Sequence, residues 1–192
     1  MIAIIGKGGS GKDYAMDLFK EHGYSVALKT TTRPRRVGEI ENVNYNFIDN
    51  EQFLKLIEDG MMYFYQHFPQ YDWYYGVTLK EASEKDVILI TPGELSTLEP
   101  SQQEDLVKIY LNISDEVIAE RLIKRDDQND KAKDRIESDR IQFAGFDNYD
   151  IQITNPNFTF EEIEKQIMDH NQHWYSLLMS SFPFNKMFKR LF

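Results

Sequence analysis

The sequence contains no cysteine among its 192 residues. Disulfide bonds, thiol nucleophiles and cysteine-ligated zinc are therefore excluded, and the composition is compatible with the cytosol. Long hydrophobic runs are also missing, because no apolar stretch approaches the roughly 20 residues that a membrane-spanning helix needs. The segment before Gly6 is too short for a signal peptide. We therefore expect a cytoplasmic protein with no membrane span.

Positive charge is scarce as well. Lysine and arginine number 22 against 32 aspartates and glutamates, which gives a formal net charge of −10. Nucleic acids and anionic membranes attract basic surfaces, so neither is expected to be the principal partner. An anionic ligand would need a local cluster of cations. With 41% hydrophobic residues, the length suits one buried core, so we expect a single domain over residues 1–192.

Short apolar runs alternate with helical patterns along the chain. Five runs predict parallel strands at residues 2–5, 25–28, 87–90, 107–113 and 150–154. Helices are predicted at residues 12–21 and 115–124, and Thr159 with Glu162 forms a capping box for a long last helix. The alternation predicts an α/β fold with a parallel sheet flanked by helices.

Residues 33–77 interrupt this alternation. Short strands are predicted there at residues 45–48, 61–66 and 73–75, around a helix at residues 50–59. We expect a small mixed α+β insertion over the ligand site. Residues 126–134 are polar without apolar periodicity, which predicts a mobile loop, with an ordinary surface turn as the alternative.

A glycine-rich loop follows the first predicted strand and opens the first predicted helix. It matches the phosphate-loop pattern GxxxxGK[ST] at Gly6, Gly11 and Lys12, but Asp13 stands where a hydroxyl normally binds Mg²⁺. Loop amides, the helix N-terminus and the lysine ammonium are the groups that hold ATP phosphates. We assign ATP binding to Gly6, Gly8, Gly9, Ser10, Gly11, Lys12 and Asp13. Asp13 is the candidate metal ligand, because Mg²⁺ prefers carboxylate oxygen.

Further motifs follow the loop along most of the chain. Residues 30–39 read TTTRPRRVGE, residues 42–49 read NVNYNFID, and residues 73–76 read WYYG. Later features are an Arg-Leu-x-x-Arg pattern from Arg121 to Arg125, then Arg135, and Asn155 after the last strand. Together these motifs resemble the guanylate kinase family up to about residue 170. The Gly-Lys-Asp ending of the loop also resembles phage deoxynucleoside monophosphate kinases.

The resemblance implies a P-loop kinase fold whose insertion, residues 33–77, binds a nucleoside monophosphate (NMP). The core would comprise residues 1–32 and 78–180, and residues 126–134 would be a mobile lid. It implies transfer of the ATP γ-phosphate to GMP, dGMP or a related monophosphate with Mg²⁺. The implied acceptor residues are Arg33, Arg36, Tyr45 and Tyr75, the implied catalytic residues are Lys12, Arg121, Arg125 and Arg135, and Asn155 would bind ATP. Forked arginine donors suit a doubly charged phosphate.

Several positions depart from the family where it reads guanine. The family carboxylate falls at Phe64, a family serine falls at Lys29, and the acidic residue after the third parallel strand falls at Thr91, with Glu94 three residues on as a substitute. A site that reads a base by hydrogen bonds loses discrimination when its partners become apolar. Two alternatives therefore stay open, a non-catalytic guanylate kinase-like binding module and a P-loop kinase with a different phosphorylated acceptor.

The last twelve residues, 181–192, form an aromatic and basic amphipathic tail. Such a segment can dock on its own domain, contact a second subunit of a homodimer, or touch a membrane. One short amphipathic turn anchors weakly in a membrane, which favours docking or a dimer contact.

Overall fold

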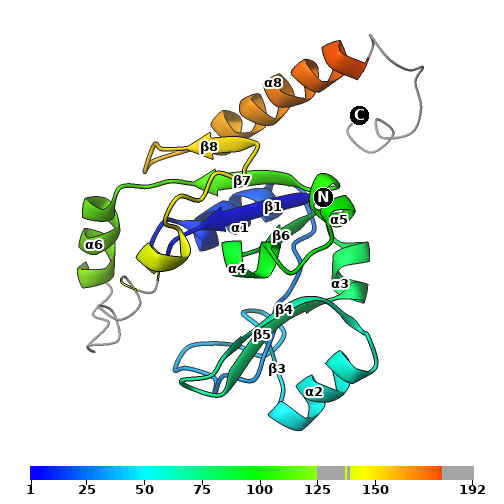
Figure 1. Cartoon of the computed structure of the whole chain (residues 1–192). Coiled ribbons are helices and arrows are strands. Elements are labelled where there is room, and N and C mark those ends of the chain that lie inside the picture. Colours follow the sequence, from blue (N-terminus) through cyan, green and yellow to red (C-terminus); the bar gives the residue numbers. More distant parts are fainter. Residues whose placement is uncertain (125–136, 138, 179–192) are drawn as a thin grey trace.

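The computed structural model describes residues 1–124, 137 and 139–178. Helices pack around two sheets (Figure 1). The strands are β1 (Ile2–Gly6), β2 (Thr30–Thr31), β3 (Asn46–Phe47), β4 (Met62–Phe68), β5 (Trp73–Thr78), β6 (Val87–Leu89), β7 (Val107–Leu111) and β8 (Ile151–Ile153). The helices are α1 (Lys12–Glu21), α2 (Asn50–Glu58), α3 (Leu79–Glu84), α4 (Pro92–Leu95), α5 (Pro100–Glu104), α6 (Asp115–Lys124) and α8 (Phe160–Leu178).

The first sheet is parallel and has the strand order β6-β1-β7-β8. Successive side chains of a strand point to opposite faces. Ala3 and Ile5 of β1 accordingly join one buried cluster, whereas Ile4 joins another cluster with Phe19 of α1 and Ile163 of α8. Both faces of the central strand are therefore covered, which is the usual setting of parallel strands and explains their continuous apolar runs.

The second sheet has the order β3-β2-β5-β4 and carries helix α2, below the first sheet in Figure 1. Helix α2 begins in a capping box, in which Asp49 accepts from the backbone N–H of Gln52 and the Gln52 side chain accepts from the backbone N–H of Asp49. Phe64 of β4 and Val77 of β5 belong to the same buried cluster as Ala3 and Ile5. The two sheets are therefore joined by a shared hydrophobic core.

The predicted parallel strands at residues 2–5, 87–90, 107–113 and 150–154 are confirmed within two residues at each end. The predicted strand at residues 25–28 is wrong, because only an isolated parallel bridge between Val26 and Val87 forms there. Side-chain carboxylates take the backbone donors that a strand ladder would use. Asp86 accepts from the N–H and the hydroxyl of Ser25, and Glu81 accepts from the N–H of Leu28.

In the insertion, the predicted strands at residues 45–48, 61–66 and 73–75 correspond to β3, β4 and β5, and the predicted helix at residues 50–59 corresponds to α2. Strand β2 and the short helices α3, α4 and α5 were not predicted. Helix α4 begins at Pro92 behind Thr91, whose side chain accepts from the N–H of Glu94. Pro fits the first turn of a helix because its missing N–H has no partner there anyway.

No helix in residues 1–124, 137 and 139–178 is both long and apolar enough to cross a membrane. The predicted lid at residues 126–134 and the tail at residues 181–192 lie outside the described residues.

Candidate functional site

The glycine-rich loop leaves the carboxyl end of β1 and enters α1. Gly11 is the N-cap of α1 with φ of 99°, a left-handed conformation that disfavours side chains. A Cβ atom on Gly6 would lie only 2.5 Å from the Ser10 hydroxyl oxygen, so the loop closes tightly on itself. That hydroxyl is buried and has no hydrogen-bond partner in the described part of the chain. The Lys12 ammonium donates to the carbonyls of Gly6 at 2.6 Å and Lys7 at 2.7 Å.

Carboxylates from later in the sequence contact this loop, and Arg140 pairs with one of them. The Lys7 ammonium lies 2.7 Å from the Asp115 carboxylate at the start of α6, and Arg140 lies 3.5 Å from the other oxygen of Asp115. The hydrogen bond from Lys7 lowers the pKa of Asp115; partial burial opposes the shift and the charges of Lys7 and Arg140 support it. The backbone N–H of Gly8 donates to the carboxylate of Asp139 at 2.6 Å. The loop is thus bound to later parts of the chain by an ion pair and by a hydrogen bond to a carboxylate.

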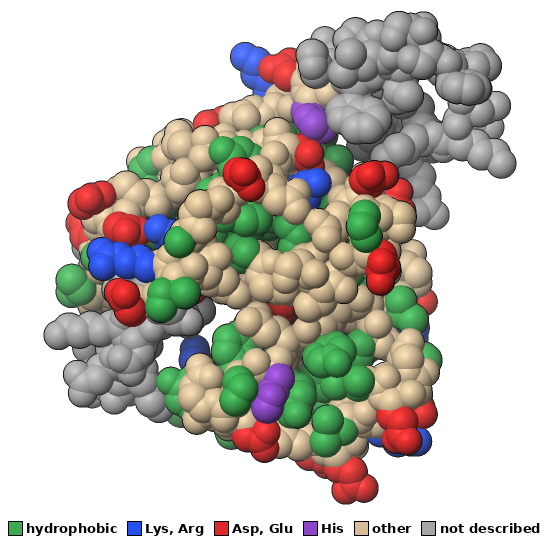
Figure 2. All heavy atoms as spheres, viewed as in Figure 1, with side chains coloured by type: hydrophobic (Ala, Val, Ile, Leu, Met, Phe, Trp, Pro, Cys, Tyr) green, Lys and Arg blue, Asp and Glu red, His purple; other side chains and the backbone are tan. Residues whose placement is uncertain are grey.

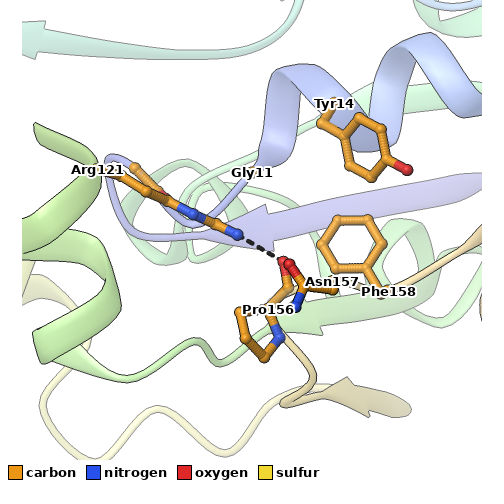
Figure 3. A pocket seen from close by; sticks show the side chains of 7 residues that line it. Gly11, Tyr14, Arg121, Pro156, Asn157 and Phe158 are labelled. Carbon is orange, nitrogen blue, oxygen red and sulfur yellow. Dashed lines mark hydrogen bonds between the residues drawn. The ribbon is translucent and has the colours of Figure 1, made fainter. Parts of the chain in front are cut away.

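A cavity of about 460 Å³ opens beside the loop. Its lining residues are Gly9, Gly11, Tyr14, Arg121, Pro156, Asn157 and Phe158. Figure 3 shows Arg121 reaching from α6 toward the carbonyl of Pro156, with the rings of Tyr14 and Phe158 on the other side of the cavity. The two ring centroids are 5.4 Å apart, and Arg121 also donates to the carbonyl of Gly9 at 3.2 Å. The cavity therefore offers a cation, two aromatic faces and the loop backbone.

The predicted residues Asp13 and Asn155 lie at the edges of this region. Asp13 is exposed in the first turn of α1, and no side chain in the described part of the chain pairs with it. The Asn155 amide donates to Glu162 at 3.0 Å and its oxygen accepts from the N–H of Asn157, so it holds the turn that lines the cavity. Among the described residues, no group of three or more histidines and carboxylates could by itself hold a metal.

The second predicted cluster lies on the second sheet. The Arg33 side chain is buried, with its guanidinium 5.4 Å from the Tyr45 ring centroid and 2.6 Å from the carboxylate of Glu39. The Tyr45 and Tyr75 rings meet edge to face at 6.1 Å. Arg36 is exposed next to them, and its backbone N–H donates to Glu39 at 2.7 Å. The structure therefore brings Arg33, Tyr45 and Tyr75 together with Arg36 beside them.

Glu39 organises this cluster. Burial acts to raise the pKa of its carboxyl, but the hydrogen bonds from Arg33 and Arg36 and their positive charges outweigh burial, so the pKa lies below the ordinary value of 4.5. Glu39 is therefore ionised near neutral pH and holds the guanidinium of Arg33 in place.

The positions that depart from the family motif lie together at the junction of the two sheets. The Lys29 ammonium binds both oxygens of Glu94, at 2.6 and 2.7 Å, and lies 5.5 Å from the ring centroid of Phe64. Glu94 also accepts from the N–H of Thr91 at 2.8 Å. Both charged side chains are largely buried, so the pair is shielded from water. Glu94 thus neutralises Lys29.

A second cavity, of about 320 Å³, opens next to this junction. It is lined by Gln66, His67, Phe68, Pro69, Gln70, Ile141 and Gln142. Phe68 packs edge-on against Tyr75, with the ring centroids 5.5 Å apart, so this cavity adjoins the cluster of Arg33 and its neighbours. A Cβ atom on Gly93 would lie 2.9 Å from the amide nitrogen of Gln142 and 3.1 Å from that of Gln66, so the two amides converge on the same point. Figure 2 shows that the surface is hollowed between the part of the molecule built on the first sheet and the part built on the second sheet.

Some residues of the site could not be predicted from the sequence, because only the tertiary structure brings them there. Asp139, Gln66 and Gln142 belong to no local motif, and only tertiary structure brings them to the loop and the second cavity. Lys7 stands inside the loop motif, but its partner Asp115 lies 108 residues away. The predicted residues Arg125 and Arg135 lie outside the described residues.

Three comparisons with known proteins agree. The family model described as "Guanylate kinase" matches residues 1–172. A guanylate kinase of Chlorobium chlorochromatii is 31% identical over 181 residues, covering 88% of this chain and 94% of the relative. A guanylate kinase of Mycoplasmoides gallisepticum is 30% identical over 185 residues, covering 90% and 93%. The crystal structure of guanylate kinase from Anaplasma phagocytophilum superposes with a TM-score of 0.64 at 19% identity, covering 97% of this chain and 96% of that chain.

Proposed function

This chain belongs to the guanylate kinase family of ATP-dependent nucleoside monophosphate kinases, and we propose that it transfers the γ-phosphate of ATP to GMP or dGMP. One observation carries the proposal. A phosphate loop that matches the motif up to Lys12 and a buried arginine beside two tyrosines occur in the same chain. Phosphoryl transfer needs two phosphates to be held in line, and each of these clusters suits one of them. A binding module without catalysis would not need the phosphate loop, so this alternative is not favoured.

The donor is proposed to bind along α1 and the first cavity. The loop amides and the Lys12 ammonium would hold the β- and γ-phosphates, as anions bind at glycine-rich turns that open a helix. The adenosine would occupy the cavity of about 460 Å³, where Tyr14 and Phe158 offer apolar faces. Arg121 borders both the loop and this cavity, which supports the proposal that it approaches the transferring group. Arg125 and Arg135 are proposed to assist Arg121 on the strength of the sequence motif.

The acceptor phosphate is proposed to bind Arg33, Arg36, Tyr45 and Tyr75. A guanidinium held by Glu39 keeps a fixed orientation, and tyrosine hydroxyls add donors without adding charge. The acceptor base would then enter the adjoining cavity of about 320 Å³, where Phe68 supplies a ring and Gln66 and Gln142 supply amides. Because Glu94 is bound to Lys29, the amides take over the reading of the base in this proposal.

Mg²⁺ is proposed as the cofactor. It usually binds through one or two carboxylates, water and the substrate phosphates, so an exposed carboxylate next to the loop lysine fits its needs. Asp13 is that carboxylate, within a described part of the chain that holds no preformed three-ligand cluster. When bound, the ion would neutralise charge on the transferring phosphate. Nucleotide substrates and the cysteine-free composition agree with the cytoplasmic location expected from the sequence.

A coupled assay of ADP release, run with GMP, dGMP and the other common monophosphates, tests the proposal. We expect turnover with GMP or dGMP, and a loss of at least about 10²-fold in kcat/KM for Lys12→Ala, because the phosphates lose their positioned cation. Lys20→Ala is the matched control, since Lys20 lies in the last turn of the same helix and, among the described residues, pairs only with the exposed Asp17. Absence of turnover with every monophosphate, in protein shown to be folded, would refute the kinase.

A further inference from the structure

A carboxylate occupies a place in the phosphate loop that suits a phosphate oxygen. The backbone N–H of Gly8 donates to the Asp139 carboxylate at 2.6 Å, across 131 residues of sequence. Amides of such glycine-rich loops are donors to anions. The short distance is typical of a bond to an ionised acceptor. Asp139 therefore takes a position at the amide of Gly8 that a bound anion could occupy.

Asp139 is held in this position by the fold. Its carbonyl accepts from the N–H of Phe143, whose ring is buried and stacks on Tyr110 of β7 at 5.7 Å. The neighbouring Arg140 reaches Asp115, the residue that pairs with Lys7 of the loop. Asp139 and Arg140 thus both connect their segment to the phosphate loop. Asp139 accepts from the backbone amide of Gly8, and Arg140 pairs with Asp115, which pairs with Lys7.

The contact has a direct electrostatic consequence for ATP. One amide N–H cannot serve a carboxylate and a phosphate oxygen together, and two anions about 3 Å apart repel each other strongly where water is scarce. We propose that Asp139 is an internal competitor of the ATP phosphates, which must leave the amide of Gly8 before the donor can bind fully. The assignment of ATP as the ligand rests on the proposed function.

The competitor sets the affinity for the donor. The fraction of molecules in which Asp139 has left the loop multiplies the intrinsic association constant, so the apparent affinity is reduced by that fraction. It also supplies the loop with an anion when the nucleotide is absent, so the amide of Gly8 is not left buried without a partner. The acceptor cluster around Arg33 does not take part, so the effect is confined to the donor side.

The test measures binding of ATP with Mg²⁺, and separately of inorganic tripolyphosphate, by calorimetry on the full chain. Asp139→Asn keeps the shape and removes the charge, and we expect its dissociation constants for both ligands to fall by about tenfold. Asp139→Ala should bind at least as tightly as Asp139→Asn. Asp147→Asn is the matched control, because it makes the same change in charge at an exposed carboxylate that lies outside the ion pairs of the loop. In turnover, KM for ATP should fall in Asp139→Asn while KM for GMP stays unchanged.

The proposal that Asp139 competes with ATP would be overturned if Asp139→Asn, with a normal melting temperature, had dissociation constants equal to or larger than those of the wild type. It would also be overturned by an equal gain in affinity in Asp147→Asn, because a general charge effect would then be a sufficient explanation. Tighter tripolyphosphate binding without turnover on any monophosphate would support the competitor and defeat the proposed kinase. If no form of the protein binds either ligand, both proposals fall.

Discussion

The buried ion pair between Lys29 and Glu94 gives the sharpest test of the energetics at the junction of the two sheets. The side chains are 12% and 2% exposed, and the ammonium binds both carboxylate oxygens. Two charges in such a place are stable only together, because each has lost most of its hydration. Removing one of them should therefore cost more than the bonds that are lost.

The two single substitutions should lower the free energy of unfolding by different amounts. Lys29→Met leaves the nearly enclosed side chain of Glu94 without its cation, although it still accepts from the N–H of Thr91. We expect a loss of about 3 kcal/mol in the free energy of unfolding, the lower end for breaking a buried pair. Glu94→Gln keeps an oxygen that can accept from Thr91 and Lys29, so its loss should be about 2 kcal/mol. The double variant carries no charge there, and its loss should fall short of the sum by about 1–3 kcal/mol.

Urea unfolding followed by circular dichroism measures these losses, with the slope m compared between variants to check that the same surface is exposed. Lys20→Met is the matched control, because its pair with Asp17 is 53% and 65% exposed and should contribute less than about 1 kcal/mol. If Lys29→Met loses no more stability than Lys20→Met, or if the losses of the two single variants simply add, the two buried charges do not stabilise each other.

Three further outcomes follow from single contacts. Since the folded-state pKa of Glu39 is lowered, its pairing with Arg33 stabilises the protein above the ordinary pKa of 4.5 and fades as the pH falls through the lower folded value. Glu39→Gln should therefore be less stable than the wild type near neutral pH, with a difference that shrinks in acid, and a difference independent of pH in urea titrations would contradict this. Gly11→Ala should lower stability by about 1–2 kcal/mol and weaken ATP binding, because φ is 99° while the new Cβ would meet its neighbours at an ordinary 3.5 Å; unchanged thermal unfolding would argue against backbone strain. Asp49→Ala should cost about 1 kcal/mol by removing the cap of α2 but leave KM for ATP unchanged, as melting curves and kinetics can check.

The parts of the fold that the sequence predicted are those that local patterns determine. Strands β1, β6 and β7 are enclosed by the core, so their apolar runs carry the signal without help from other segments. The run at residues 25–28 has a similar composition, yet Asp86 and Glu81 capture its backbone donors. No pattern within residues 25–28 reveals that competition, because the carboxylates lie more than 50 residues away.

The residues of the candidate site also differ in how far a local pattern could predict them. The phosphate loop is one continuous segment, so its residues can be assigned from spacing alone. Arg33, Tyr45 and Tyr75 come from three separate segments, and their proximity was expected only from the resemblance to the family. Asp139 carries no motif at all. Its proposed role depends on a hydrogen bond to a backbone amide, which every residue type except proline can supply.

Four cations of the candidate site have protein partners within the described part of the chain. The contacts join Lys7 to Asp115, Lys12 to the carbonyls of Gly6 and Lys7, Arg33 to Glu39, and Arg121 to the carbonyls of Gly9 and Pro156. Binding of a nucleotide is then an exchange of partners, whose net free energy is smaller than the sum of the new contacts. In a chain with a net charge of −10, this arrangement also gives the internal anions a direct influence on affinity. Removing a cation should weaken nucleotide binding, whereas removing an anion that competes for the same donor should strengthen it. Asp139 tests this contrast directly, because it binds the loop through the amide of Gly8.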